Sequence, residues 1–330
     1  MKAAFISNSN GIIDRVYSKE TQEILKSKFE FYDGVYTIHN SNELKDVECI
    51  FSTWGMPAYT PEQIDEFFPK LKIVFYGAGS VQAFARPFLN KGIAVISAWM
   101  ANSVPVVEYS VAQIILANKG FYQVTNKVDS RNGRDVSRKY FESYSGNYNT
   151  KVGLIGLGAI GAGVAEQLKN FKLDVYAYDP FASEEKAKNL NVTLTSLEYI
   201  FENCQTISNH CANLPETQNI LNGDLFKLMK KNATFINTGR GAQVVEADLI
   251  AALEEEPDRT AVLDVTMPEP PEENHPFYSM PNVFLTPHIA GSAGDECMRM
   301  GDYMLDEANR FLNGEDLKYS VSLKMLETMA

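Results

Sequence analysis

Short hydrophobic runs alternate with longer amphipathic stretches over the first hundred residues of the chain. The short runs predict strands and the amphipathic stretches predict helices. The expected elements are, in order, Ala3–Ser7, Thr21–Phe29, Cys49–Thr53, Pro61–Phe68, Leu71–Tyr76, Val81–Leu89 and Ile93–Ser97. Strands separated by helices are typical of a parallel sheet with crossover connections. We therefore expect a first α/β layer here.

A second alternating series begins after Thr150 and fits a six-stranded doubly wound fold. Its expected elements are Val152–Ile155, Gly161–Lys169, Val175–Tyr178, Leu197–Cys204, Thr206–His210, Leu221–Lys230, Thr234–Asn237, Glu246–Glu255, Ala261–Val265 and Val283–Leu285. The amphipathic stretch Ala293–Leu312 predicts a final helix, which is expected to return to the first layer.

Two segments lie between the series. Apolar and small residues recur at helical spacing from Val104 to Leu116, behind Asn102 and Ser103, which can cap a helix. This predicts a long interdomain helix. The polar segment Asp129–Tyr148 carries few aliphatic side chains and is expected to be a surface excursion or a subunit contact.

Composition narrows the class of protein. The 330 residues have room for two domains, and a formal charge of −12 would repel nucleic acid or an anionic membrane surface. The four cysteines show no CxxC pairing, so they indicate neither a metal site nor a redox motif but reduced, cytosolic thiols. The N-terminal apolar stretch is too short for a signal sequence, and no uncharged apolar run reaches the roughly 18 residues of a membrane span. We expect no membrane crossing.

The segment 151–161 places a G-x-G-x-x-G turn between an apolar strand and a helix. Gly156 permits the tight turn, Gly158 lets a pyrophosphate approach the backbone, and Gly161 lets the helix pack closely. The N-terminus of that helix would offer N–H donors and the positive end of its dipole to the phosphates.

Asp179 follows the next strand, 18 positions after Gly161 (179 − 161). An acid at this place is expected to hydrogen-bond the adenosine ribose, and it would repel the 2′-phosphate of NADP. Neither Arg nor Lys occurs in the three residues after it, 180–182. The turn and the acid together predict an oxidoreductase that uses NAD.

Three later segments carry the candidate chemistry at strand ends, which face the ligand crevice of a parallel sheet. These segments are 235–241, 263–270 and 285–291. Arg240 can clamp a substrate carboxylate through its fork of donors. His288 can donate a proton to a carbonyl oxygen as hydride arrives, and take it back in the reverse direction. Glu269, if hydrogen-bonded to His288, would favour the imidazolium and hold the ring.

The order of these motifs resembles the D-2-hydroxyacid dehydrogenase family over nearly the whole chain. The resemblance is most specific in the glycine turn, in 237–241, in 263–270 and in 286–291. It implies reversible hydride transfer between NADH and a small 2-oxo acid, with Arg240, Glu269 and His288 as the catalytic set. It also implies two Rossmann-like α/β domains. Residues 1–102 and 295–330 would form a flavodoxin-like substrate domain, and 103–294 an inserted NAD-binding domain.

The resemblance also carries binding residues and an assembly. The positions that match those lining NAD are Gly156, Gly158, Ala159, Ile160, Gly161, Asp179, Cys211, Thr238, Gly239, Arg240, Asp264, His288 and Gly291. The first-domain residues expected at the substrate, together with Arg240, are Trp54, Gly55, Ala78 and Gly79. Similar enzymes are usually cytoplasmic homodimers joined through their NAD domains, which would give Asp129–Tyr148 an interface role. Asp264 could equally serve only as a strand-end residue. Trp54 could shape the substrate pocket or fill core, and core is the commoner place for a large apolar side chain.

One other function stays open beside this one, because some similar proteins are NAD-sensing corepressors that keep the catalytic set. Formate dehydrogenases share the fold but carry Gln where this chain has Glu269, which argues against that function. The chain departs from the family pattern at Met267, where many members have an acid, and at 211–213 near the cofactor. It ends at Ala330 without the regulatory extension of some phosphoglycerate dehydrogenases. Of the other histidines, His39 and His275 are expected to be structural, and His210 lies outside the catalytic set.

Overall fold

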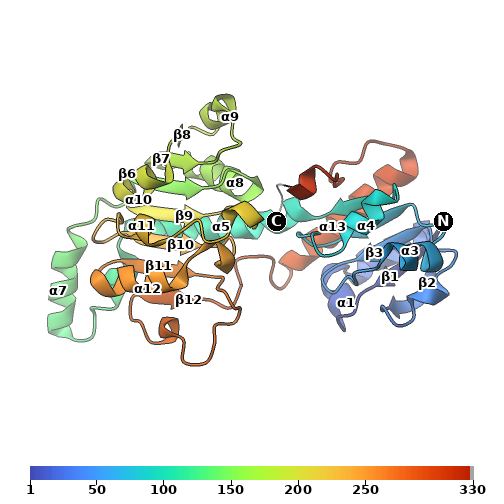
Figure 1. Cartoon of the computed structure of the whole chain (residues 1–330), viewed down its shortest axis with the longest axis horizontal. Coiled ribbons are helices and arrows are strands. Elements are labelled where there is room, and N and C mark those ends of the chain that lie inside the picture. The colour runs from blue at the N-terminus through green and yellow to red at the C-terminus, as the bar shows by residue number, and fades with distance from the viewer. Residues whose placement is uncertain (328–330) are drawn as a thin grey trace. The chain divides into compact units, whose positions relative to one another are not determined.

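The computed structural model describes residues 1–327, which divide into two compact units (Figure 1). Unit 1 consists of Met1–Ser103 and the described chain from Ser292 onward, and unit 2 is Val104–Gly291. The helix α5 (Trp99–Asn118) belongs to unit 1 up to Ser103 and to unit 2 from Val104. Unit 2 is therefore an insertion between two segments of unit 1.

Unit 1 is a parallel sheet of five strands in the order β2-β1-β3-β4-β5. Its strands are β1 (Lys2–Ile6), β2 (Glu30–Tyr36), β3 (Cys49–Ser52), β4 (Ile73–Tyr76) and β5 (Ala94–Ser97). Its helices are α1 (Ile12–Val16), α2 (Lys19–Lys28), α3 (Pro61–Phe67), α4 (Ala85–Asn90) and α13 (Glu296–Asn313), with 3-10 turns at Ser41–Glu43 and Met325–Glu327. This strand order is the flavodoxin-like one that the sequence predicts.

The core of unit 1 lies on both faces of its central strands. Every residue of β3 and β4 is buried, because helices cover the sheet on both sides. Helix α13 buries Met300 and Met304 in this core and packs against α1 and β4. Helix α13 therefore belongs to the same compact unit as the first strands of the chain.

Unit 2 is a parallel sheet of seven strands in the order β12-β11-β10-β9-β6-β7-β8. Its strands are β6 (Tyr148–Ile155), β7 (Lys172–Tyr178), β8 (Thr193–Leu194), β9 (Thr206–Asn209), β10 (Thr234–Asn237), β11 (Thr260–Leu263) and β12 (Val283–Leu285). Its helices after α5 are α6 (Phe121–Thr125), α7 (Arg131–Phe141), α8 (Ala159–Leu168), α9 (Glu184–Asn189), α10 (Leu197–Asn203), α11 (Gly223–Phe226) and α12 (Glu246–Glu255), with 3-10 turns at Pro215–Thr217, Gly241–Gln243 and Pro276–Tyr278. The order is that of a doubly wound nucleotide-binding sheet.

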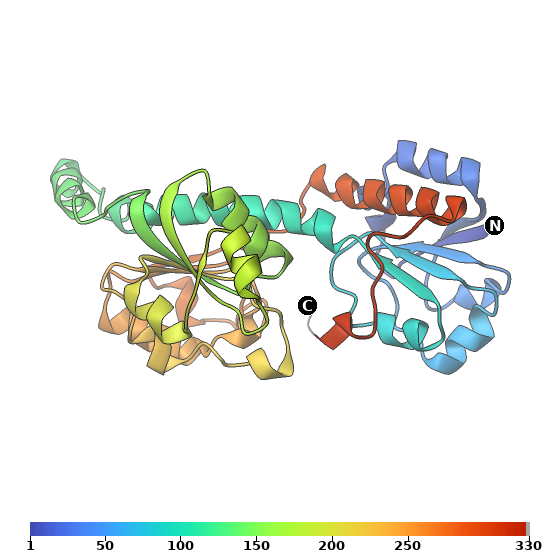
Figure 2. The ribbon, with the colours of Figure 1, turned by 90° about the horizontal axis from the view of Figure 1, so that it is seen from above.

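Two hydrophobic clusters cover the two faces of the unit 2 sheet. One joins α5 and α8 to the sheet, and Figure 2 shows α5 running along this sheet. The other joins α10, α11 and α12 to the opposite face. The strand order reverses between β6 and β9, which pair with each other. A crevice outside the carboxyl ends of the strands at such a reversal is where ligands bind in open α/β sheets.

The structure corrects the sequence prediction in several elements. The unit 2 sheet has seven strands and not six, because the two-residue strand β8 pairs with β7 at its edge. Helix α5 begins at Trp99, so Asn102 and Ser103 lie inside it and do not cap it. The Ser103 hydroxyl instead donates a hydrogen bond to the Met100 carbonyl oxygen. Strand β2 and the helices α1, α6, α7 and α9 were not predicted.

Within residues 1–327, α5 is also the one helix long and apolar enough to span a membrane by length and composition. The charged Glu108 interrupts the apolar run of this helix. Several of its side chains, among them Val107 and Ile114, are buried in the core of unit 2. Core helices of soluble proteins pass the same test, so this finding is weak evidence for a membrane span.

Candidate functional site

The glycine turn lies at the strand-order reversal, between β6 and α8. Gly156 has φ of 87°, and a Cβ there would come within 2.9 Å of the His210 carbonyl oxygen on the neighbouring chain segment. A Cβ on Gly161 would overlap the Gly156 carbonyl oxygen, whereas one on Gly158 would meet open space. Ala159 and Ile160 open α8. The turn therefore combines a helix N-terminus with open backbone at Gly158, which suits a bound pyrophosphate.

The Asp179 carboxylate is held against this turn by two backbone N–H groups. Its Oδ2 accepts from Leu157 N at 2.7 Å, and its Oδ1 accepts from Phe181 N at 2.8 Å. The Lys186 ammonium donates to the Leu157 carbonyl oxygen at 2.6 Å. The carboxylate is partly exposed, so it can still accept from the hydroxyls of a ribose.

The loop that carries Arg240 is built on a buried network of side-chain amides. The Asn209 amide donates to Asn237 Oδ1 at 3.0 Å and to Gln243 Oε1 at 2.7 Å. Gln243 Oε1 also accepts from Arg240 N, and Gly239 N donates to Asn237 Oδ1. The Arg240 guanidinium donates one N–H to the Gly239 carbonyl oxygen at 2.7 Å. The amides thus fix the turn, while the arginine side chain keeps donors for a ligand.

His210 is a buried neutral imidazole beside this loop. Its Nδ1 lies 3.1 Å from Thr238 Oγ1 and its Nε2 lies 3.0 Å from Ser208 Oγ. Burial lowers the pKa of His210 to about 3. His210 therefore stays uncharged near neutral pH and orients the Thr238 hydroxyl, in agreement with its exclusion from the catalytic set.

Cys211 follows on the loop after β9. Its backbone N donates to Asn209 Oδ1 at 3.2 Å, and its carbonyl oxygen accepts from Gln243 at 2.9 Å. Burial, with a smaller effect from the Asp179 charge, raises the pKa of the Cys211 thiol to about 11. The side chain is therefore a protonated thiol at neutral pH and not an activated nucleophile.

His288 and Glu269 form a close acid–imidazole pair. His288 Nδ1 lies 2.6 Å from Glu269 Oε1, with side chains 46% and 40% exposed. His288 has φ of 54°, a left-handed conformation that is rare for a residue with a Cβ. Because Nδ1 faces the carboxylate, its N–H donates there, and Nε2 is left to exchange a proton with a ligand.

Asp264 holds the turn that carries His288. Its Oδ1 accepts from the Thr286 hydroxyl at 2.6 Å and from Ile289 N at 2.8 Å, and its Oδ2 accepts from Ala290 N at 3.0 Å. Its carbonyl oxygen also accepts from His288 N at 3.1 Å. Asp264 is 2% exposed. Both carboxylate oxygens serve the backbone of this turn, which ends at Gly291, and through it they orient the His288 ring.

The unit 1 residues expected at the substrate lie after β3 and β4. The Ser7 hydroxyl donates to the Trp54 carbonyl oxygen at 2.9 Å, and Gly55 has φ of 83° with no room for a Cβ beside Ser9. The Ser97 hydroxyl donates to the carbonyl oxygens of Ala78 and Gly79 at 2.9 and 2.6 Å. Ala78 is fully buried, whereas the other three residues have accessible surface.

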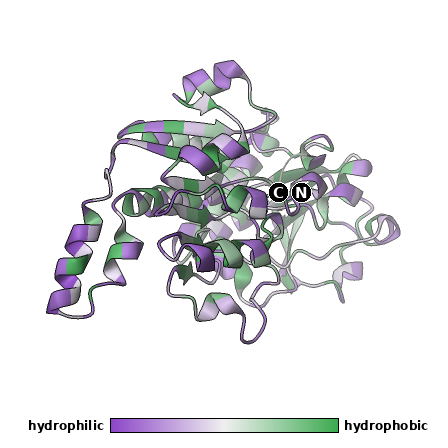
Figure 3. Cartoon of the chain, turned by 60° about the vertical axis from the view of Figure 1, so that its left-hand side comes forward, coloured by the Kyte–Doolittle hydropathy of each residue, from purple (hydrophilic) through white to green (hydrophobic). Residues whose placement is uncertain are grey.

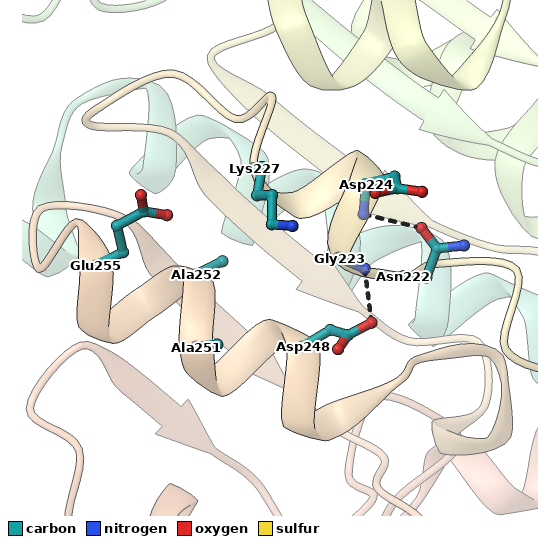
Figure 4. A pocket seen from close by; sticks show the side chains of 8 residues that line it. All are labelled: Asn222, Gly223, Asp224, Lys227, Asp248, Ala251, Ala252 and Glu255. Carbon is teal, nitrogen blue, oxygen red and sulfur yellow. Dashed lines mark hydrogen bonds between the residues drawn. The ribbon is translucent and has the colours of Figure 1, made fainter.

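A hollow on the outer face of unit 2 lies between α11 and α12 (Figure 4). Its lining residues are Asn222, Gly223, Asp224, Lys227, Asp248, Ala251, Ala252 and Glu255. Asp248 Oδ2 accepts from Gly223 N at 2.7 Å, which fastens the start of α11 to α12. Three carboxylates against one lysine make this hollow repel an anionic ligand. Within residues 1–327 no group of three or more His, Cys, Asp or Glu could hold a metal ion.

The structure brings several of the expected residues to one edge of the unit 2 sheet. Arg240, Asp264 and His288 follow β10, β11 and β12, which are adjacent strands, and Glu269 meets His288 directly. The sequence reasoning missed the amides of Asn209, Asn237 and Gln243. Their signal was available, since two of them end consecutive buried strands, where a polar side chain needs a partner.

Comparisons with known proteins agree with this geometry. The family model described as "D-isomer specific 2-hydroxyacid dehydrogenase, NAD binding domain" matches residues 111–290. The chain is 32% identical to D-3-phosphoglycerate dehydrogenase of Methanocaldococcus jannaschii over 248 residues, which are 74% of this chain and 46% of that protein. The chain spans about half the length of the curated relatives that it matches first.

Solved structures share the fold over nearly the whole chain. The NAD-complexed form of a D-isomer specific 2-hydroxyacid dehydrogenase from Lactobacillus delbrueckii ssp. bulgaricus aligns with a TM-score of 0.77 at 20% identity, covering 98% of this chain and 100% of that one. The apo form of D-mandelate dehydrogenase from Rhodotorula graminis aligns with a TM-score of 0.80 at 19% identity, covering 97% of each chain. At this identity the likeness concerns the fold alone.

Proposed function

The chain belongs to the D-isomer specific 2-hydroxyacid dehydrogenases, and from this premise we propose that it interconverts a small 2-oxo acid and the D-2-hydroxy acid with NAD. The observation that carries the proposal is the 2.6 Å pair of His288 and Glu269. An imidazole whose Nδ1 is held by a carboxylate has its Nε2 free to exchange a proton, which is the acid–base element that such a reaction needs. The chain would act in the cytoplasm, in keeping with its unpaired cysteines.

NAD is the cofactor of the matched family domain, and the residues of unit 2 fit it. The helix N-terminus at Gly158, Ala159 and Ile160 offers backbone donors to the pyrophosphate, and Asp179 offers acceptors to the ribose. Cys211, Thr238, Gly239 and Gly291 complete the proposed cofactor contacts. When bound, the reduced nicotinamide supplies the hydride, and the oxidised form accepts it.

Three side chains bind the substrate and transfer the proton. Arg240 binds the substrate carboxylate with the donors left after its bond to Gly239, and it polarises the adjacent carbonyl. His288 Nε2 gives its proton to the carbonyl oxygen during reduction and removes it from the hydroxyl during oxidation. Glu269 stabilises the imidazolium in between. In unit 1, the loops of Trp54, Gly55, Ala78 and Gly79 are proposed to meet the substrate through backbone N–H groups.

We further propose that two copies of the chain associate through the arm formed by α6 and α7. This arm and its flanks expose large hydrophobic side chains at Phe121, Val128, Val136, Phe141 and Tyr148. Figure 3 shows hydrophobic residues interrupting the hydrophilic ones along α7, and Figure 1 shows that helix projecting from the sheet of unit 2. Exposed apolar side chains gathered on one segment are typical of a protein–protein contact.

The test is an assay of the purified chain with NADH and a panel of 2-oxo acids, namely pyruvate, glyoxylate, hydroxypyruvate, 2-oxoisocaproate and phenylpyruvate. The proposal predicts turnover of at least one of them. His288→Asn should lower kcat by about a hundredfold or more, because general acid–base catalysis contributes about that much. His39→Asn, which changes an exposed histidine of unit 1, should leave the rate unchanged.

The outcomes separate an enzyme from an NAD sensor. NADH binding without turnover on any acid of the panel would reject the dehydrogenase proposal and leave the corepressor alternative standing. The same rejection follows if His288→Asn keeps the full wild-type rate, because the acid–base role would then lie elsewhere.

A further inference from the structure

A second acid–imidazole pair lies next to the first, formed by Glu246 and His275. His275 Nε2 is 3.5 Å from Glu246 Oε2, and the side chains are only 18% and 13% exposed. Glu246 is the first residue of α12, and His275 precedes the 3-10 turn Pro276–Tyr278. Burial raises the pKa of the Glu246 carboxyl, and the Met267 N–H and His275 lower it in part. A carboxyl buried this far needs partners to stay charged.

The orientation of the His275 ring follows from its neighbours. Its Nδ1 accepts from Phe277 N at 3.4 Å, so the proton of the neutral ring is on Nε2, which faces Glu246. The ring also packs edge-on against the Phe277 ring, with centroids 4.6 Å apart. His275 therefore presents a donor to Glu246 in either charge state.

The second oxygen of Glu246 reaches the segment that carries Glu269. Glu246 Oε1 accepts from Met267 N at 2.8 Å, two residues before Glu269. The Thr266 hydroxyl donates to the Pro268 carbonyl oxygen at 2.8 Å and stiffens the same segment. Glu246 thus holds the backbone from which the proposed partner of His288 extends.

The loop of Arg240 is fastened to this segment as well. A Cβ on Gly241 would overlap the backbone of Thr266 and Met267, so the two chains lie in direct contact. Gly241 follows Arg240, and the same loop leads into α12 at Glu246. One buried carboxylate therefore joins the loop of the proposed carboxylate-binding arginine to the loop of Glu269.

We propose that Glu246 and His275 are positioning residues that hold the 266–269 segment so that Glu269 meets His288. The inference rests on the proposed function for its catalytic consequence. The geometry that it predicts concerns only the contact between Glu269 and His288. Leu249 and Leu253 bury α12 in the core independently of Glu246, so replacing Glu246 releases the segment without removing the helix.

The experiment follows the ring nitrogen signals of isotope-labelled histidine by NMR in the full chain at one fixed pH. The chain has four histidines, so the spectrum can be assigned with single substitutions. In Glu246→Ala the Nδ1 signal of His288 should move away from its wild-type position by more than the line width, because the Glu269 carboxylate is no longer held beside it. Glu246→Gln keeps an oxygen that can accept from Met267 N, so its Nδ1 signal of His288 should stay near the wild-type position.

Glu254→Ala is the matched control, because it removes an exposed carboxylate from the same helix. Its His288 Nδ1 signal should stand at the wild-type position. A folded Glu246→Ala chain with an unmoved His288 Nδ1 signal overturns the proposal. If Glu246→Ala fails to fold, His275→Gln decides: its His288 Nδ1 signal should move in the same direction by a smaller amount, and an unmoved signal overturns the proposal.

The kinetic readout separates this inference from the proposed function. With a substrate from the panel, Glu246→Ala should lower kcat about tenfold to a hundredfold, as expected for a misplaced catalytic group, and leave the Kd for NADH within about twofold. Turnover that is unchanged in Glu246→Ala contradicts positioning. If the wild type turns over no acid while the His288 Nδ1 signal still moves in Glu246→Ala, the proposed function fails and the positioning role stands.

Discussion

The carboxylate of Glu269 lies 2.6 Å from the His288 ring, and this makes the role of its charge testable. Glu269→Gln keeps the size and an acceptor oxygen but removes the charge that stabilises the imidazolium. We expect kcat/KM for reduction to fall about tenfold or more. The measurement is the steady-state rate with the best substrate of the panel.

Glu272→Gln is the control for that change, because Glu272 is an exposed carboxylate of the same loop. Its kcat/KM should match that of the wild type. A Glu269→Gln chain with the wild-type kcat/KM would mean that His288 works without its carboxylate.

Asp179 is expected to discriminate against NADP through its charge. Asp179→Asn keeps an acceptor for the Leu157 N–H but no longer repels a 2′-phosphate, and the Lys186 ammonium lies nearby on the Leu157 carbonyl. The ratio of kcat/KM with NADPH to that with NADH should rise about tenfold or more. Asp174→Asn changes an exposed carboxylate on β7, the strand that leads to Asp179, and should leave the ratio unchanged. An equal rise in both variants would reject the role assigned to Asp179.

His210 gives a prediction for stability. Its pKa is about 3 in the folded chain, below the usual 6.5, so the unfolded chain binds a proton that the folded chain does not. The contribution of the neutral His210 to the free energy of unfolding is fully present above pH 6.5. It is lost as pH falls toward 3, at up to about 1.4 kcal/mol per pH unit. Over that interval the free energy of unfolding of His210→Asn should fall less steeply than that of the wild type in urea titrations. The exposed His39→Asn should keep the wild-type slope.

At the scale of residues, the sequence motifs point to candidate groups for the chemistry but do not show which contacts hold those groups in place. Arg240 and His288 stand in recognisable motifs. Asp264, in contrast, has both oxygens on the 286–290 turn, and Glu246 bonds a backbone N–H 21 positions away. Such long-range contacts have no local pattern, because they depend on which strands become neighbours.

At the scale of elements, the glycine turn gives the sharpest prediction. Gly161→Ala places a Cβ onto the Gly156 carbonyl oxygen, so the helix must move away from the turn. We expect a loss of about 1–3 kcal/mol in the free energy of unfolding and a clear rise in the Kd for NADH. Gly314→Ala gives a contrast, since that glycine has open space but a left-handed φ of 69°. It should lower stability without changing the Kd for NADH.

The missed elements have separate physical causes. Strand β2 lies at a sheet edge, and most of its side chains are exposed, so the hydrophobic alternation of a buried strand is absent. Strand β8 is only two residues long. Helix α7 carries few apolar residues, and its pattern resembles a polar loop. The buried strands β3 and β4 were predictable because burial on both faces selects largely apolar runs.

At the scale of the whole molecule, the proposed association of two copies through α6 and α7 is tested by the molecular mass in solution. Val136→Glu together with Phe141→Glu places charges on two exposed apolar sites of the arm. Sedimentation should show half of the wild-type mass at micromolar concentration, with the fold retained by circular dichroism. Leu228→Glu, a similar change at an exposed site outside the arm, should keep the wild-type mass. A wild type that sediments as a monomer would reject the association.

The central claim concerns the reaction itself, and the configuration of its product tests it most directly. The 2-hydroxy acid formed from NADH and the best 2-oxo acid of the panel should be separated by chiral chromatography. The account predicts the D enantiomer from the wild type and a loss of its formation in His288→Asn. Formation of the L enantiomer, or of a racemate at a rate independent of His288, would contradict it.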